Sequence, residues 1–403
     1  MAVAAPTGLS PTRLGRLTRA MRGYVDRGET PGLVTLVLRN GVEAHCDVLG
    51  TLGDEAATPL PRDALWRLGS MTKVVTSVAA LILLEEGALR LDDRVAQWLP
   101  ELAGARVLTA PGAELDSVRA PARAITVRDL LTHRAGFASY AMPQGPIGRA
   151  AMALMAGTSM RPDLAPDVWL ARLAELPLIH DPGERMVMGF SSDVLAILIA
   201  RAAGTTFPDF LRERILAPLG MDDTMFWAGD DAIARLGPAL TVGWLNNKRT
   251  VHDPAAGGYF SRPPAHPSGG GGLLSTADDF ARFGAMLLNG GRLGDERILS
   301  RKTVELMTTD FLTPEQRAIP YFATPYWRDR GFGLGVFVTD DVAARGAPVS
   351  VGQYGWRGAF GTYWFNDPRE RLVAVLMLPV SWPAVIPPIL GDFETLVYQA
   401  IED

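Results

Sequence analysis

The sequence is poor in several features that would point to particular classes of protein. Its 403 residues include a single cysteine, Cys46, so an intrachain disulfide is impossible. Basic and acidic side chains nearly balance, at 39 and 44, which gives no electrostatic argument for binding nucleic acid or an anionic membrane. No apolar run reaches the length of a membrane span. Residues 1–11 lack a basic segment followed by an apolar core, so we expect no secretory signal and a cytoplasmic protein.

The composition is that of an ordinary folded protein, with 48% hydrophobic and 21% charged residues. A chain of this length can bury a large core and form two subdomains. The glycine-rich run at 268–272 is followed by no P-loop lysine, and no set of metal ligands stands out. We therefore expect neither a metal nor an organic cofactor.

The residue patterns predict strands near both chain ends and helices between them. Helical spacing over 12–27 precedes two strand-like segments, 33–38 and 43–48, and the Asn40-Gly41 turn between them is typical of a hairpin. A strand at 65–68 leads into an apolar helix that begins at about Met71. Helices and loops fill most of 91–201, including an Ala-, Met-, Gly- and Pro-rich segment expected to form a loop at 145–166. The later strands are expected at 333–338, 353–356, 362–366 and 372–378, before a closing helix at about 392–401.

This order indicates an α/β (α+β) fold, in which an antiparallel sheet is flanked by terminal helices and interrupted by a helical insertion. We expect residues 1–85 and 225–403 to form the α/β domain and residues 86–224 a mainly helical subdomain. The active site is expected in the cleft between them.

The pair Ser70 and Lys73 is the strongest chemical signal. Positions i and i+3 share one face of a helix, so the hydroxyl and the amine can meet. Burial beneath the apolar run 74–82 favours a neutral amine, which can accept the serine proton. Taken alone, Ser-x-x-Lys also fits a helix-capping serine followed by a solvated lysine.

Further motifs give the pair its context, and together they resemble the serine β-lactamase and penicillin-binding-protein superfamily. The closest resemblance is to class C-like members: family VIII carboxylesterases and lovastatin-type acyltransferases. It extends from about Leu14 to Tyr398. The landmarks are Leu-Leu-Thr-His-Arg-Ala-Gly at 130–136, Asp-Pro-Gly at 181–183, Asp-Val-Leu at 193–195, Ala-Pro-Leu-Gly-Met at 217–221, the run at 268–272 and Gly-Thr-Tyr-Trp at 361–364.

The resemblance implies a role for each matching residue. Ser70 corresponds to the acylated nucleophile and Lys73 to its general base. Trp356-Arg357-Gly358 corresponds to the third family motif, which is Lys-Thr-Gly in β-lactamases and Trp-x-Gly in many esterases. The backbone N–H groups of Ser70 and Ala359 would form the oxyanion hole. Trp356 also fits a packed strand aromatic, and Gly358 a bulge or close backbone approach.

The second family motif departs from the pattern. A tyrosine is expected six residues after the proline of Pro-Gly, where this chain has Met188, followed by Gly189 and Phe190. Methionine has no titratable proton, so Lys73 acts alone, another group substitutes, or the chemistry has changed. The candidate substitutes are Tyr140, Tyr259, Tyr354 and His266, although each also fits core packing or a surface position.

The leading hypothesis is a serine hydrolase of esterase type that acts through an acyl-Ser70 intermediate on a small ester or amide. The expected substrate-binding residues are Met188, Phe190, Trp356, Arg357 and Gly358. An acyltransferase of the same mechanism is the close alternative, with an alcohol or amine in place of water. A remodelled binding scaffold is the second class, motivated by Met188 and Phe190. The expected partner is a small-molecule ester or acyl substrate, with no nucleic acid or membrane, and the oligomeric state is left open.

Overall fold

The computed structural model describes residues 7–53, 55–139, 145–155, 162–243, 248–321, 325–381 and 388–403. Within these residues, the main sheet has seven antiparallel strands in the order β11-β12-β13-β14-β15-β1-β2. They are β1 (Gly32–Arg39), β2 (Val42–Gly50), β11 (Arg330–Phe332), β12 (Phe337–Thr339), β13 (Tyr354–Arg357), β14 (Tyr363–Asp367) and β15 (Leu372–Met377).

Both ends of the chain build this sheet, because β1 pairs with β15. The predicted hairpin is present between β1 and β2, where Asn40 and Gly41 both have a positive φ, of 57° and 77°. Two such residues suit the tight turn that matches the twist of the flanking strands. The prediction of an antiparallel sheet built from both chain ends is therefore confirmed.

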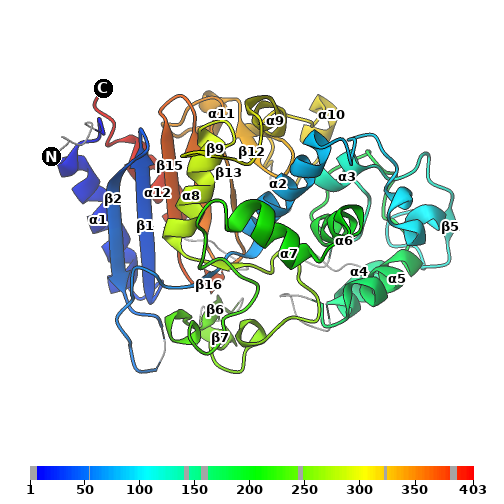
Figure 1. Ribbon diagram of the computed structural model, residues 1–403, viewed down its shortest axis with the longest axis horizontal. Coiled ribbons are helices and arrows are strands. Elements are labelled where there is room, and N and C mark those ends of the chain that lie inside the picture. The colour runs from blue at the N-terminus through cyan, green and yellow to red at the C-terminus, as the bar shows by residue number, and fades with distance from the viewer. Residues whose placement is uncertain are drawn as a thin grey trace.

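Helices cover both faces of the sheet and fill the middle of the chain (Figure 1). They are α1 (Pro11–Asp26), α2 (Thr72–Glu85), α3 (Val127–Leu131), α4 (Gly145–Leu154), α5 (Pro166–Glu175), α6 (Ser191–Ala203), α7 (Phe207–Leu211), α8 (Ala277–Leu288), α9 (Arg301–Met307), α10 (Pro314–Arg317), α11 (Val342–Arg345) and α12 (Ile389–Tyr398).

Neighbouring side chains of β14 show which helix lies on which face. Phe365 packs against Phe393 of α12 at 6.1 Å between ring centroids. Trp364, one residue earlier, packs against Phe280 of α8 at 5.7 Å. Successive strand residues point to opposite faces, so α12 and α8 cover opposite sides of the sheet. Strand β15 is completely buried between these layers.

Short strands form small separate sheets. They are β3 (Trp66–Arg67) with β8 (Leu274–Ser275), β4 (Val107–Leu108) with β5 (Val118–Arg119), β9 (Arg292–Leu293) with β10 (Glu296–Arg297), and β6 (Ala239–Val242) between β7 (Arg249–Asp253) and β16 (Val380–Ser381).

Two expectations about local structure are wrong, those for 333–338 and 145–166. The strand expected at 333–338 mostly covers the turn between β11 and β12, where Gly335 has a left-handed φ of 94°, and only Phe337 and Val338 lie in β12. The segment 145–166 was expected to be a loop, but α4 occupies its first part, because Ile147, Ala151 and Leu154 recur at helical spacing and are buried. Elsewhere, the region 228–262 is polar and poorly periodic in sequence, and it contains β6 and β7. The first four residues of β7, from Arg249 to His252, are exposed, which explains why hydrophobicity gave no signal there.

In the part of the chain that the structure describes, no single helix is long and apolar enough to cross a membrane. The bent pair Ser191–Ala203 and Phe207–Leu216 meets the length and composition test only when its two parts are taken together.

Candidate active site

The turn that carries Ser70 is held between two distant segments. Strand β3 pairs with β8, and the next residue, Leu68, donates its N–H to the carbonyl of Leu273 at 2.9 Å. Gly69 follows with a φ of 52°, a conformation that glycine adopts without steric cost. Ser70 then lies in a 3-10 turn, Gly69–Met71, and the α-helix begins only at Thr72. The α-helix therefore begins one residue after the expected start at about Met71, and Ser70 lies in the tighter turn before it.

Lys73 reaches back to Ser70, as the spacing predicted. Its Nζ lies 2.9 Å from the Ser70 Oγ and 2.5 Å from the carbonyl oxygen of Gly270. The lysine side chain is buried, whereas Ser70 is partly exposed. Burial lowers the pKa of Lys73 to about 8, although the nearby Asp193 carboxylate acts in the opposite direction. The Lys73 Nζ donates to both oxygens, and once it has lost a proton it lies in position to accept the proton of the Ser70 hydroxyl.

The glycine-rich run approaches this site through a second set of hydrogen bonds. Asp193, in the first turn of α6, accepts from the Ser268 hydroxyl at 2.5 Å and from the Gly270 N–H at 3.1 Å. A Cβ added at Gly270 would lie 2.6 Å from the Asp193 Oδ2. Position 270 therefore requires glycine, because the backbone there passes directly against the Asp193 carboxylate.

The end of β13 brings Ala359 close to the turn that carries Ser70. A Cβ added at Gly69 would lie 3.0 Å from the Ala359 nitrogen, and one at Gly358 would lie 2.2 Å from the Leu68 carbonyl oxygen. Within the described residues, neither the Ser70 nor the Ala359 N–H donates a hydrogen bond. Two free N–H groups on adjoining backbone segments are the donors that an oxyanion requires.

The other expected substrate-binding residues differ in exposure. Met188 and Arg357 are partly exposed. Phe190 is fully buried and packs edge-on against Trp169, with 5.3 Å between ring centroids. Trp356 is 5% exposed and packs against Phe332 at 5.3 Å. Phe190 and Trp356 thus support the site from within the core.

The proposed substitutes for the missing tyrosine are placed elsewhere or are poorly suited to proton transfer. Tyr354 is buried, its oxygen accepts from Asn366, and burial raises its pKa. Tyr259 packs in a separate cluster of buried residues. His266 lies against Trp169, and burial lowers its pKa. Tyr140 lies outside the described residues.

His133 is a group near Lys73 that the sequence did not single out for chemistry. Its Nε2 lies 3.5 Å from the Ser192 Oγ, and its φ is 53°. Burial, reinforced by the charge of Lys73, lowers the pKa of His133 to about 3, so the ring is neutral at physiological pH. The only sequence signal was its place in the landmark at 130–136.

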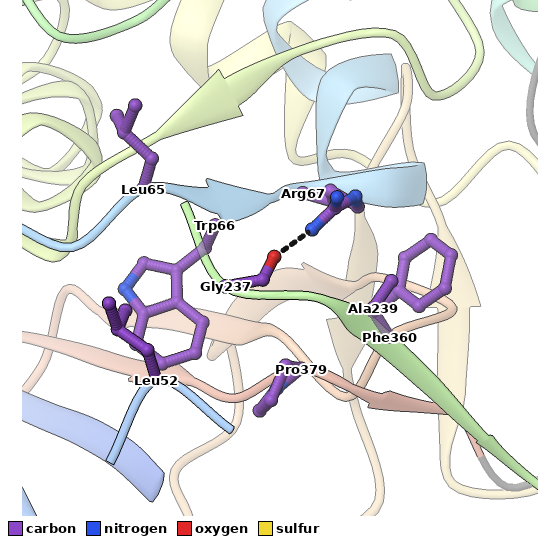
Figure 2. Close-up of a pocket in the computed structure, with 8 residues that line it drawn as sticks. All are labelled: Leu52, Leu65, Trp66, Arg67, Gly237, Ala239, Phe360 and Pro379. Carbon is purple, nitrogen blue, oxygen red and sulfur yellow. Dashed lines mark hydrogen bonds between the residues drawn. The ribbon is translucent and has the colours of Figure 1, made fainter. Parts of the chain in front are cut away.

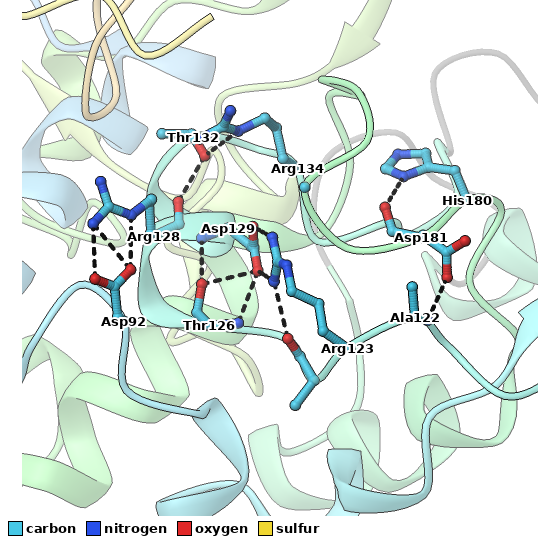
Figure 3. Close-up of polar contacts among 12 residues, drawn as sticks. Asp92, Ala122, Arg123, Thr126, Arg128, Asp129, Thr132, Arg134, His180 and Asp181 are labelled. Atoms are coloured by element: carbon cyan, nitrogen blue, oxygen red, sulfur yellow. Dashed lines mark hydrogen bonds and ion pairs between the residues drawn. The ribbon is translucent and has the colours of Figure 1, made fainter.

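A polar network holds the loop that contains His133 (Figure 3). Arg123 pairs with the buried Asp129, which caps α3 together with Thr126. Arg134 donates to the Thr132 hydroxyl at 2.9 Å and to the carbonyl of Phe311 at 3.0 Å. The helical part of the chain is thereby tied to the segment before α10.

A small pocket lies beside β3, and none of its lining residues is a predicted site residue (Figure 2). Arg67 at its edge forms a buried ion pair with Asp253 at 2.6 Å and donates to the Gly237 carbonyl at 2.7 Å. These contacts anchor the strand that leads to Ser70. The pocket is lined by Leu52, Leu65, Trp66, Arg67, Gly237, Ala239, Phe360 and Pro379.

Across the described ranges, no group of three or more His, Cys, Asp or Glu side chains is arranged to hold a metal ion.

Comparison with protein families decides the classification. The family model described as Beta-lactamase matches residues 17–380. The chain belongs to the beta-lactamase family. The fold predicted from the motifs is therefore confirmed.

Three proteins that are similar to this chain show which members of the family it resembles. Protein Rv1367c of Mycobacterium tuberculosis is 38% identical over 89% of this chain and 88% of its own. Esterase EstB of Burkholderia gladioli is 28% identical over 91% of this chain and 90% of its own. The solved structure of EstCE1, a hydrolase with promiscuous acyltransferase activity, superposes with a TM-score of 0.82 at 25% identity, covering 96% of this chain and 98% of that one.

Proposed function

We propose that this beta-lactamase family member is a serine hydrolase of esterase type that forms an acyl-enzyme on Ser70. The observation that carries the proposal is the 2.9 Å contact between the Ser70 hydroxyl and a buried Lys73 amine whose pKa is lowered to about 8. The similarity to Esterase EstB and to EstCE1 supports ester substrates.

The proposed reaction uses each of these groups in turn. Lys73 takes the hydroxyl proton as the Ser70 Oγ attacks the ester carbonyl. The N–H groups of Ser70 and Ala359 stabilise the negative oxygen of the tetrahedral intermediate. The Lys73 ammonium then gives its proton to the leaving alkoxide, and the acyl group stays on Ser70. Water, deprotonated by Lys73, attacks the acyl-enzyme and releases the acid.

Met188 makes Lys73 the single proton-transfer group in this proposal. A thioether neither gives nor accepts a proton at working pH. Both proton transfers therefore pass through one amine, and leaving groups of low basicity are favoured because they need least protonation. Activated esters, such as aryl esters, are the substrates expected to turn over fastest.

Arg357 suggests a preference among those esters. It lies two residues before Ala359, with its guanidinium carbon 5.5 Å from the centre of the Tyr326 ring. In the described part of the chain it forms no ion pair. A partly exposed cation held against an aromatic ring suits a carboxylate on the substrate.

Acyl transfer is the second candidate function, favoured by the similarity to EstCE1, whose acyltransferase activity is described as promiscuous. The same acyl-Ser70 would then be attacked by an alcohol instead of water. Adding a primary alcohol to the assay distinguishes the two reactions, because transfer yields a new ester and hydrolysis yields the free acid.

The deciding experiment combines p-nitrophenyl butyrate turnover with intact mass spectrometry after treatment with a fluorophosphonate. Hydrolysis and a single phosphonyl adduct are expected for the wild type, and both should be lost in Ser70→Ala. Ser77→Ala, which removes another hydroxyl from α2, is the matched control and should keep both. A wild type with no adduct, or Ser70→Ala with undiminished turnover, contradicts the proposal.

A further inference from the structure

The carbonyl that holds Lys73 is itself oriented by a buried acid. Besides Ser70, the Lys73 amine has one polar contact among the described residues, the Gly270 carbonyl oxygen at 2.5 Å. This carbonyl belongs to a run of four glycines, whose backbone has no side chains of its own to fix it. An external contact must therefore set the direction in which the carbonyl points.

That contact is made through Ser268. The peptide between Gly270 and Gly271 presents its carbonyl to Lys73, and its N–H donates to the Ser268 Oγ at 3.1 Å. The Ser268 hydroxyl donates to the Asp193 Oδ1 at 2.5 Å. The N–H and C=O of a trans peptide point in opposite directions, so anchoring the N–H on Ser268 fixes the carbonyl toward Lys73.

Asp193 also acts on the run directly. Its Oδ1 accepts the Gly270 N–H at 3.1 Å, and its side chain is only 3% exposed. The carboxylate forms no ion pair with a described residue, and its place in the first turn of α6 lets the positive helix end stabilise its charge.

The charged and titratable groups around this unit are few. Lys73 lies on α2, and the Asp193 carboxylate opposes the lowering of the lysine pKa by burial. His133 and His266 also lie near Lys73 and Asp193. Burial lowers the pKa of both rings, so both are neutral at the pH values above 7 at which Lys73 titrates. Lys73 is thus the cation on which the Asp193 charge acts.

We propose that Asp193 is a positioning residue for the reaction: through Ser268 and the Gly270–Gly271 peptide it orients the carbonyl that holds the Lys73 amine against Ser70. This inference rests on the proposed role of Lys73 as the base. The Asp193 carboxylate touches neither reacting atom, and its effect is transmitted by the peptide and by its charge.

The test uses two variants that separate orientation from charge. Asp193→Asn keeps an oxygen acceptor of the same shape and removes the charge. Ser268→Ala keeps the charge and removes the link to the Gly271 N–H. The rate constant for phosphonylation of Ser70 by a fluorophosphonate is measured against pH for both variants and the wild type, with thermal unfolding as the check on folding.

The wild-type rate should rise with pH around a midpoint near 8. Asp193→Asn should move the midpoint to lower pH, because the charge that favours the ammonium form is gone. Ser268→Ala should leave the midpoint in place and lower the limiting rate by roughly tenfold or more, because the amine is misplaced. Folded variants with the midpoint and limiting rate of the wild type overturn the inference.

A separate readout distinguishes this inference from the proposed function. The chain has three lysines, Lys73, Lys248 and Lys302, so the Cε signal of Lys73 can be followed by NMR and assigned with Lys73→Met. If the wild type is not phosphonylated, the proposed function fails. A Lys73 titration that is identical in Asp193→Asn and the wild type then overturns the positioning role too, whereas a shift to lower pH in the variant supports it.

Discussion

The Lys73 Nζ lies 2.9 Å from the Ser70 Oγ, but the two residues differ in their exposure to solvent. The lysine side chain is 3% exposed, and Ser70 is partly exposed. A substrate can therefore reach the hydroxyl while the amine stays out of water. The amine therefore loses its proton near pH 8 instead of near pH 10.5, so a larger fraction of it is neutral at physiological pH than for an exposed lysine, while the Ser70 hydroxyl stays accessible.

The buried amine should cost stability in a way that depends on pH. The unfolded chain binds the Lys73 proton up to about pH 10.5, whereas the folded protein loses it near pH 8. Because the unfolded state binds more protons between these values, this group makes the free energy of unfolding rise with pH from about 8 to 10.5. Below pH 8 the penalty is fully present, at about 3 kcal/mol.

Lys73→Met removes this penalty and keeps the volume of the side chain. The variant should be inactive and more stable than the wild type at pH 7, as measured by urea unfolding. The stability difference should shrink as the pH rises from 8 to 10.5, since other groups titrate equally in both proteins. A difference that stays constant over this range would show that the lysine is not desolvated.

Met188→Tyr should raise ester hydrolysis. Because the resemblance assigns residue 188 to the family tyrosine, a phenol there is expected to give the leaving group a second proton donor, and general acid–base catalysis by one group contributes about 10²–10⁴-fold in enzymes. An increase in kcat of at least about tenfold is expected for alkyl esters, and less for activated aryl esters. Met188→Phe is the matched control, because it supplies the ring without the hydroxyl. Equal rates in the two variants would mean that Lys73 already meets the whole demand for proton transfer.

Gly69→Ala should damage both stability and the oxyanion site. Its left-handed φ of 52° costs an alanine about 1 kcal/mol, and the new Cβ would lie 3.0 Å from the Ala359 nitrogen. Gly41→Ala is the control, because Gly41 also has a positive φ and its added Cβ would meet nothing within 4 Å. Both variants should lose stability in urea unfolding, and only Gly69→Ala should lose phosphonylation. Equal phosphonylation rates would argue against Ala359 as an oxyanion donor.

Arg357→Met should change substrate preference more than overall activity. A hydrogen bond to a charged group contributes about 1.5–3 kcal/mol, so kcat/KM for an ester bearing a carboxylate should fall about tenfold or more. A neutral ester of the same size serves as the internal control and should be nearly unaffected. Raising the salt concentration should reduce the wild-type preference and leave the variant unchanged. Equal losses for both esters would assign Arg357 a structural role.

Local patterns predicted those parts of the structure that depend on neighbouring residues. Asn40-Gly41 indicated its hairpin because two positive φ values suit those residue types. The spacing of Ser70 and Lys73 predicted the contact between the amine and the hydroxyl, because one helical turn separates the two residues.

The contacts that hold Lys73 and the glycine-rich run in place could not be predicted from local sequence patterns. Asp193 and Ser268 are 75 residues apart, and Lys73 and Gly270 are 197 apart, so no local period connects them. The sequence offers no reason for the glycine at position 270, which becomes clear only from the Asp193 carboxylate that lies against it in the structure. Strand β7 was missed for a different reason, because its exposed residues carry no hydrophobic alternation.

The backbone of Leu68 joins regions that are far apart in the chain. Its N–H reaches Leu273, and its carbonyl accepts from the Thr362 hydroxyl, 294 residues away. Long-range contacts of this kind form slowly, because the loop between the partners must close before the contact stabilises it. The turn that carries Ser70 can therefore reach its final shape only after β8 and β14 have docked. During refolding, the return of Ser70 reactivity should be among the last signals to appear. The rate of phosphonylation at successive times would therefore report when folding of the whole chain is complete.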